Sequence, residues 1–520
     1  MKRTACCAHS TRRNTPRSGP AAARISSAAD AAPPGNLVAG SAAAVTFTDL
    51  LANGQAVGRI DGLVIFVTGP LPGESVDVRV TSVKAKYAVG EALTYHTRSP
   101  LRAEPFCPVF GVCGGCQVQH LAYPAQLAWK EQIVRNALRR IGGFTDIVVA
   151  HPVGMAHPRA YRNKMSLVVV PRADATRFGF YQARSHELVP IEACPVVVPQ
   201  LDAAIAGLHA AAADPRTAPA FNDVKHAIMR VGTASGQAVL SLTTERHSAA
   251  IAAAAPALAE KIPGVVGISN SFEPRNANAV LGRKMAYVWG AREMEEVIEG
   301  VRFRVSPASF FQVNSDMVGR IFRFMAPGLA PGRKVVDLYC GAGTFAIFFA
   351  ARGAQVVGIE ENPAAIREAN LNAELNAVTG RARFIAGRVE GAVAAAGGRA
   401  ALNAADIVFL DPPRKGSDEA TLDAIAAAGV DNVWYLSCNP ATLARDLRTL
   451  ETKGYVPGLV QPFDMFPQTG HVETFVTLHR RGGSPIGLPP ADAFPWLDDM
   501  PAWPAEERFT GDEFADLGDR

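Results

Sequence analysis

The stretch Val335-Val-Asp-Leu-Tyr-Cys-Gly-Ala-Gly-Thr-Phe-Ala346 decides the fold of the C-terminal part of this chain. An apolar run with β character meets two glycines and then a helical run, a pattern typical of a strand, a tight turn and a helix. Gly341 and Gly343 let a ligand approach the backbone of the turn, and Glu360, about 20 residues on, is placed to take ribose hydroxyls. The pattern also satisfies the loose dinucleotide fingerprint, so an NAD site is an open alternative.

Residues 301–482 around this stretch alternate strand and helix patterns, which predicts a Rossmann-like parallel sheet with helices on both faces. The expected strands lie near Lys334–Leu338, Gln355–Glu360, Arg383–Ala386, Asp406–Asp411, Asn432–Ser437, Val456–Met465 and Val472–His479. The expected helices lie near Thr344–Arg352, Pro363–Asn376, Asp418–Ala428 and Pro440–Lys453.

Two strand ends in this region carry chemistry. The first is Asp406-Ile-Val-Phe-Leu-Asp411-Pro-Pro-Arg414, and the second is Trp434-Tyr-Leu-Ser-Cys-Asn-Pro-Ala441. Asp-Pro-Pro corners are typical of methyltransferases, whereas an NAD enzyme has no obvious use for one. Since neighbouring parallel strands end at one edge, Asp411 and Cys438 should face one pocket. A helix starting just after Cys438 would lower the pKa of the thiol and favour the nucleophilic thiolate, although a free cysteine is often only a small buried hydrophobe.

The stretch Gly470-His-Val-Glu-Thr474 opens the final strand pattern. Glu473 would enter the sheet as a carboxylate among apolar residues, and burying that charge is costly without a purpose or a partner. A carboxyl group with a raised pKa suits a general base. A surface-facing edge residue is the alternative for Glu473.

The N-terminal part reads as a small β-barrel over residues 43–100, followed by an α+β region over residues 101–300. Short strands are expected at Val45–Phe47, Gly58–Ile60, Leu63–Val67, Ser75–Val83 and Lys86–Tyr95. Barrels of the OB type often hold nucleic acid. In the following region, Tyr161 stands among Arg159, Arg162 and Lys164, a mixture of aromatic and cationic side chains that suits single-stranded RNA.

A cysteine-rich loop, Cys107-Pro-Val-Phe-Gly-Val-Cys113-Gly-Gly-Cys116, lies near the start of the α+β region, and Cys194-Pro195 follows later in it. Its three thiols and Cys194 make a four-thiolate set, which suits zinc as well as an iron–sulfur cluster. The chain has eight cysteines in 520 residues. That is too few for a disulfide scaffold, so clustered thiols indicate metal binding or catalysis in a reducing compartment, and we expect a cytoplasmic protein.

The composition allows a large globular core, with 48% hydrophobic and 19% charged residues. No apolar stretch approaches the roughly 18 residues of a membrane span. The net charge of +4 is uneven, because residues 481–520 hold three Arg against nine Asp or Glu and leave +10 on residues 1–480. This favours a polyanionic partner only mildly. We expect residues 1–42 to be a disordered basic tail and residues 483–520 to be a poorly ordered acidic tail.

Five motifs together resemble the RNA (uracil-5-)-methyltransferases. They are Phe310-Phe-Gln312-Val-Asn314, Asp337-Leu-Tyr-Cys-Gly341, Asp411-Pro-Pro-Arg414, Ser437-Cys-Asn-Pro440 and His471-Val-Glu473, in the family's order. The cysteine set resembles the branch with a TRAM barrel and a [4Fe–4S] cluster, typified by 23S rRNA enzymes. The resemblance implies S-adenosylmethionine as methyl donor, with Cys438 as nucleophile and Glu473 as base. By the same resemblance, the donor is held by Gln312, Tyr339, Glu360 and Asp411, and the cluster by Cys107, Cys113, Cys116 and Cys194.

The function implied is methylation of carbon 5 of a uridine, with 23S rRNA favoured over the T-loop of tRNA. It implies no obligate protein partner, and we expect a monomer. Two other functions stay open. An NAD-linked iron–sulfur oxidoreductase would use the glycine turn and the thiols but would leave Asp411, Cys438 and Glu473 idle. A catalytically silent RNA-binding protein would have no need of Cys438 and Glu473.

Overall fold

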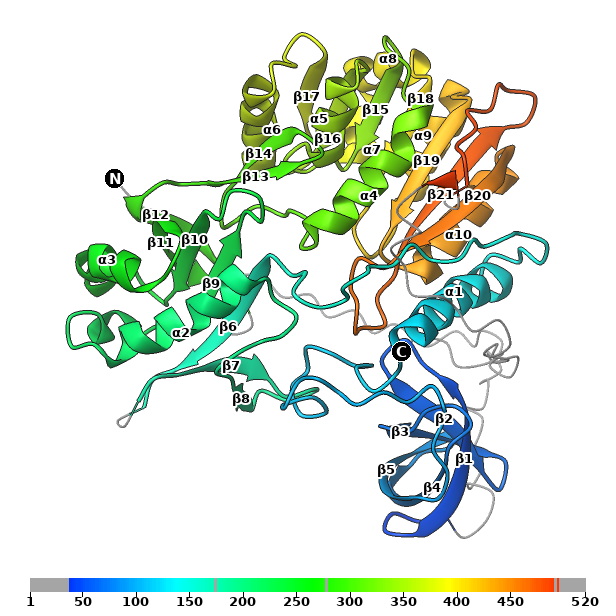
Figure 1. The fold of residues 1–520 in the computed structure, drawn as a ribbon. Helices are drawn as coiled ribbons and strands as arrows, with labels where there is room; N and C mark the ends of the chain where they lie inside the picture. Colours follow the sequence, from blue (N-terminus) through cyan, green and yellow to red (C-terminus); the bar gives the residue numbers. More distant parts are fainter. Residues whose placement is uncertain (1–36, 173–174, 276–278, 491–492, 495–520) are drawn as a thin grey trace, which may run out of the picture.

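The fold comes from a computed structural model that describes residues 37–172, 175–275, 279–490 and 493–494. Most of the two expected tails, 1–42 and 483–520, lies outside the described residues. Within these ranges the chain forms a closed barrel, a central sheet with helices, and a C-terminal sheet with helices on both faces (Figure 1). No helix in the described part is both long and apolar enough to cross a membrane.

The N-terminal strands close into a barrel in the order β1-β2-β3-β5-β4, with β4 pairing back to β1. Alternate side chains point inward along each strand, so Phe47, Ile65 and Val78 fill the interior. The strands are β1 (Ala42–Leu50), β2 (Gln55–Ile60), β3 (Leu63–Thr68), β4 (Ser75–Val83) and β5 (Tyr87–Tyr95). The small barrel predicted from the short strands is therefore confirmed.

Helix α1 (Tyr123–Arg140) joins the barrel to the C-terminal sheet. Its Trp129 packs into the barrel core and donates a hydrogen bond to the Leu50 carbonyl at 2.8 Å. Val134 and Leu138, further along the helix, pack instead with the core of the C-terminal sheet. Helix α1 thus contacts both the barrel and the C-terminal domain.

The central sheet has the order β12-β11-β10-β9-β6-β7-β8, and α2 and α3 pack into its core. Its elements are β6 (Lys164–Val170), β7 (Arg177–Tyr181), β8 (Leu188–Pro190), α2 (Pro199–Ala213), a short 3-10 turn (Ala218–Phe221), β9 (His226–Val231), β10 (Ala238–Thr243), α3 (Ala249–Lys261), β11 (Val265–Pro274) and β12 (Gly282–Gly290). A hairpin of β13 (Met294–Ile298) and β14 (Val301–Val305) then leads to α4 (Ser315–Met325).

The C-terminal sheet has the order β17-β16-β15-β18-β19-β21-β20. Its elements are β15 (Lys334–Leu338), α5 (Thr344–Ala351), β16 (Gln355–Glu360), α6 (Pro363–Leu375), β17 (Ala382–Ala386), α7 (Val389–Ala394), α8 (Ala396–Asn403), β18 (Ile407–Leu410), α9 (Glu419–Ala428), β19 (Asn432–Ser437), α10 (Pro440–Thr452), β20 (Tyr455–Phe463) and β21 (Glu473–Arg480).

One feature of this sheet differs from the prediction of a fully parallel sheet. Strands β17 to β19 are parallel, but β21 lies antiparallel to both β19 and β20. The cause is the connection of residues 464–472, which holds no helix, so the chain reverses direction instead of crossing over. Strand β21 therefore begins at the edge where the parallel strands end.

Candidate active site

A cavity of about 870 Å³ opens at the carboxyl edge of the C-terminal sheet, and Asp411, Cys438 and Glu473 all line it. Asp411 follows β18 and Cys438 follows β19, so both stand where parallel strands end. Glu473 begins β21 at the same edge because β21 runs the other way. Ser437 pairs with Thr474 in this register, which makes Cys438 and Glu473 the next positions along the two strands.

Tyr339, Gly341, Glu360 and Gln312 line the same cavity. Gly341 has φ +55°, and a Cβ added there would meet nothing within 4 Å, so the turn is open towards the cavity. Its N–H donates to Glu360 Oε2 at 3.2 Å. Tyr339 has φ +67°, a strained conformation for an aromatic residue and one found at functional sites. These residues can cradle an adenosine-bearing ligand at the turn.

Gly343 does not line this cavity, although the sequence pattern placed it with Gly341. It has φ +85° and precedes α5, and a Cβ added to it would lie 3.2 Å from the Ala369 Cβ and from Ile347 Cγ1. The absence of a side chain therefore lets α5 and α6 pack closely, which is a different use of glycine in the same turn.

The two carboxyl groups of the cavity are held in unfavourable surroundings for their charges. Burial raises the pKa of Asp411 to about 7. Burial, followed by repulsion from Asp411, holds the pKa of Glu473 well above its usual range, while Arg414 opposes the shift. Glu473 is 2% exposed, and its Oε1 has no hydrogen-bond partner within the described residues. A buried carboxyl with a free oxygen that faces a cavity can exchange a proton with a bound substrate.

The expected lowering of the Cys438 thiol pKa by a helix is wrong. Burial, followed by the charges of Glu473 and Asp411, raises it to about 11. Helix α10 does begin two residues later, but Pro440 has no N–H and the Ala441 N–H is capped by Asn439 Oδ1 at 3.1 Å. The first two helix positions therefore offer no free donor, and the Cys438 N–H and the Arg414 charge, which lower the pKa of the thiol, do not offset its burial.

The four cysteines Cys107, Cys113, Cys116 and Cys194 line a second cavity of about 390 Å³. Burial raises the pKa of Cys116 to about 12, and neighbouring thiolates add to the shift. Across the described ranges, no group of three or more His, Cys, Asp or Glu side chains is arranged to hold a metal ion. The structure thus brings the four thiols to one cavity but does not form a single-ion site there.

Other residues of the catalytic cavity were not singled out as site residues by the sequence. His471 and Phe466 lie edge to face, with ring centroids 5.8 Å apart, and Arg414 Nη2 lies 3.4 Å from His471 Nε2. All three line the cavity beside Glu473. His471 and Arg414 stand inside the quoted motifs. Their closeness in sequence to Glu473 and Asp411 could therefore have indicated that they belong to the site. No sequence pattern marked Phe466 as a site residue, because it lies in an irregular loop.

The comparison with known families agrees with this geometry. A model of the tRNA (Uracil-5-)-methyltransferase family matches residues 122–481, and a TRAM domain model matches residues 39–93. A Bacillus cereus protein named as an uncharacterised RNA methyltransferase is 36% identical over 446 residues, which cover 84% of this chain and 96% of that protein. A Gloeobacter violaceus protein of the same description is 37% identical over 460 residues, which cover 86% of this chain and 98% of that protein.

A solved structure is similar over most of the chain. It is the Pyrococcus abyssi tRNA (uracil-54, C5)-methyltransferase in complex with S-adenosyl-L-homocysteine, with a TM-score of 0.67 and 26% identity. The match covers 84% of this chain and 100% of that chain. The chain described here belongs to the tRNA (uracil-5-)-methyltransferase family and is an S-adenosylmethionine-dependent RNA methyltransferase.

Proposed function

We propose that this enzyme methylates carbon 5 of a uridine through a covalent adduct between Cys438 and carbon 6 of the base. The observation that carries the proposal is the placement of Cys438 and Glu473 at adjacent strand ends around one cavity. A thiol and a buried carboxyl with a raised pKa are the nucleophile and base that this reaction needs.

The chemistry explains why both groups are required. Carbon 5 of uracil is a poor nucleophile, but addition of the Cys438 sulfur to carbon 6 turns the ring into an enolate. Carbon 5 then takes the methyl group from the sulfonium of the donor, leaving S-adenosylhomocysteine. Glu473 removes the remaining proton from carbon 5, and the bond between sulfur and carbon 6 breaks as the double bond returns. The thiol gives its proton to solvent on addition and takes one back from solvent on elimination, so the net proton released is that of carbon 5, which the ionised form of Glu473 removes.

The methyl donor and the target uracil must meet over the same edge of the sheet. We assign Gln312, Tyr339, Glu360, Gly341 and Asp411 to the donor, on the support of their shared cavity. The donor supplies an electrophilic methyl group. A base stacked in a helix cannot present both faces, so the target uridine must be flipped out or already unpaired. Phe310, 74% exposed at the cavity, is suited to contact RNA at this opening.

For the second cavity we propose a [4Fe–4S] cluster held by Cys107, Cys113, Cys116 and Cys194. The support is that all four thiols line one cavity. A four-iron cluster is wider than a single ion, so thiols arranged around a cavity suit it better than zinc. Its role in this scheme is to hold the fold and the RNA-contacting surface. Cluster-bound thiolates agree with a reducing cytoplasm, where we place the enzyme as a monomer.

We favour 23S rRNA as substrate, because the barrel and cysteine set resemble those of 23S rRNA enzymes. A uridine of tRNA is the second candidate, favoured by the Pyrococcus abyssi relative, whose described substrate is tRNA uracil-54.

The test is trapping with 5-fluorouridine-substituted 23S rRNA and tRNA in the presence of the methyl donor. Fluorine at carbon 5 cannot leave as a proton does, so the adduct should persist. We expect a protein–RNA complex with one of the two RNAs, mapped to Cys438 by mass spectrometry and missing in Cys438→Ala. A protein that binds the donor yet forms no adduct with either RNA would refute the mechanism.

A further inference from the structure

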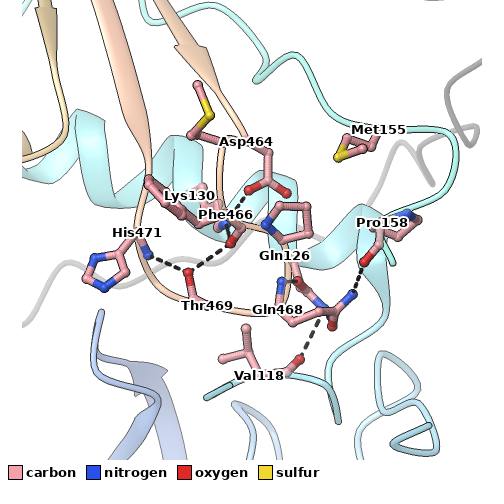
Figure 2. A network of polar contacts seen from close by, with 12 residues as sticks. Val118, Gln126, Lys130, Met155, Pro158, Asp464, Phe466, Gln468, Thr469 and His471 are labelled. Carbon is pink, nitrogen blue, oxygen red and sulfur yellow. Dashed lines mark hydrogen bonds and ion pairs between the residues drawn. The ribbon is translucent and has the colours of Figure 1, made fainter. Parts of the chain in front are cut away.

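The loop of residues 464–472 leads directly into Glu473 and brings Phe466 and His471 to the catalytic cavity. It has no regular secondary structure that would fix its course. The position of Glu473 at the cavity therefore depends on what holds this loop. Figure 2 shows contacts within the loop and contacts to Gln126, Lys130 and Pro158. These three residues lie more than three hundred positions upstream in the sequence.

Lys130 of α1 lies completely buried against the loop, and its partner Asp464, the first residue of the loop, is completely buried as well (Figure 2). Lys130 Nζ lies 2.5 Å from Asp464 Oδ1 and donates to the Phe466 carbonyl at 3.0 Å. The Tyr123 hydroxyl donates to Asp464 Oδ2 at 2.8 Å. Burying two charges is costly, and an apolar pair of similar volume is often at least as stabilising. The presence of this buried ion pair is therefore better explained by the position that it imposes on the loop than by a gain in stability.

The rest of the loop is anchored in the same way. Gln126 and Gln468 exchange two hydrogen bonds of 3.0 Å, and the N–H groups of Gln117 and Val118 donate to the Gln468 carbonyl at 3.0 and 3.1 Å. Gln468 has φ +70°, which is costly for a residue other than glycine. The surroundings therefore hold a strained turn in place.

The last part of the loop is held by the turn itself and by the barrel. Thr469 Oγ1 donates to the Phe466 carbonyl at 2.8 Å and accepts the His471 N–H at 3.2 Å. A Cβ added to Gly470 would lie 1.7 Å from the Ala52 carbonyl oxygen, so the barrel packs directly on the loop. The chain at Gly470 therefore cannot shift towards the barrel.

We propose that Lys130 is a positioning residue for catalysis, which fixes the loop carrying His471 and Glu473 through Asp464 and the Phe466 carbonyl. This rests on the proposed function, in which Glu473 removes the proton from carbon 5. A displaced Glu473 slows removal of the carbon 5 proton, while Cys438, at the end of another strand, still adds to the uracil ring. The methylated covalent adduct should then persist longer than it does in the wild-type enzyme.

The first experiment uses full-length Lys130→Met with ordinary, unfluorinated RNA. We expect turnover to fall about 10- to 100-fold, as for a misplacement near 1 Å, with the KM for RNA changed by less than roughly twofold. A covalent complex between protein and methylated RNA should accumulate during turnover. The control is Arg135→Met, which also removes a cation from α1 but at a half-exposed position, where Arg135 pairs with Glu131. It should turn over and release product like the wild type.

Lys130→Met leaves Asp464 buried without its partner, so lost stability must be separated from lost position. The double variant Lys130→Met/Asp464→Leu makes the pair apolar and should recover most of the stability that Lys130→Met loses, short of the hydrogen bond from Tyr123. The proposal expects turnover to stay low and the adduct to persist. Recovery of both turnover and product release would overturn it, because the pair would then be merely structural.

The two proposals can fail separately. If wild-type enzyme is not trapped by 5-fluorouridine RNA, the proposed function fails. If the wild type is trapped while Lys130→Met releases product at the wild-type rate, only the role of Lys130 fails.

Discussion

The two cysteine cavities of this enzyme differ in what surrounds the sulfur. In the catalytic cavity, Cys438 faces the carboxyl groups of Asp411 and Glu473 and the guanidinium of Arg414. In the second cavity, Cys107, Cys113, Cys116 and Cys194 face one another. Burial raises thiol pKa values in both places, to about 11 for Cys438 and about 12 for Cys116.

This difference distinguishes a cysteine suited to catalysis from cysteines suited to binding a metal. A thiol beside groups that exchange protons, in a cavity wide enough for a donor and a nucleotide, can add to a substrate and be released. Within the described residues no carboxyl group lines the second cavity, and four neighbouring thiolates would repel one another without a cationic centre. We therefore expect changes at Cys438 to act on turnover and changes in the second cavity to act on iron content and stability.

The largest effect should come from Cys438→Ala. Without the sulfur no adduct can form, and turnover should fall at least about 10³-fold, as for the loss of a catalytic nucleophile. Methyl transfer from labelled donor to RNA measures this. The iron content and the unfolding temperature should match those of the wild type. Residual turnover within about tenfold of the wild type would show that methyl transfer does not need the thiol.

The next effect should come from Glu473→Gln, which keeps the shape of the side chain and removes the base. We expect turnover to fall about 10²- to 10⁴-fold. Unlike Cys438→Ala, this variant should accumulate a covalent complex with ordinary RNA, because addition and methyl transfer precede the lost step. Gel separation under denaturing conditions, with labelled methyl groups, detects it. A variant that loses turnover without any complex would place Glu473 before the methyl transfer.

A smaller effect on turnover should come from Cys116→Ser, which weakens the second cavity. We expect loss of iron and sulfide and a loss of about 3 kcal/mol of stability, typical of losing a tightly bound ligand. Trapping by 5-fluorouridine RNA should survive, because Cys438 is unchanged. Wild type purified without iron, and equal in stability to the variant, would instead show that these thiols hold no cluster.

The sequence predicted the parts of the site that depend on strand ends. Asp411, Cys438 and Glu473 could be placed at one edge because parallel strands end together and the motifs mark those ends. The strand and helix positions were close to the observed ones for the same reason, since each has its own local pattern of apolar residues. The four thiols also lie at one cavity, as their shared chemistry suggested.

What the sequence could not predict depends on contacts between distant segments. The reversal of β21 arises from a helix-free connection, and no local pattern shows which strand it pairs with. Lys130 stands in the sequence beside other cations of α1, and only the fold reveals that it is buried and paired with Asp464. The shift in the pKa of Cys438 was predicted in the wrong direction. The sequence does not show that Asn439 caps the helix or that the thiol is partly buried.

The smallest effect should be a gain in stability at high pH for Asp411→Asn. Because the folded-state pKa of Asp411 is raised to about 7 from an ordinary value near 4, the folded protein holds its proton more tightly than the unfolded chain. That stabilisation is complete below about pH 4 and is lost as the pH rises to about 7. At pH 8 the wild type therefore carries a buried charge beside Glu473 that Asn removes.

The unfolding temperature of Asp411→Asn should accordingly rise by roughly 2–4 °C at pH 8 and change little at pH 4. Asp61→Asn, in the exposed turn between β2 and β3, is the control and should change neither value. A lower unfolding temperature at pH 8 would mean that the Asp411 carboxylate is stabilised by a partner in the folded state. We expect the gain to come with lower turnover, because the charge that destabilises this cavity belongs to a residue that we assign to binding of the methyl donor.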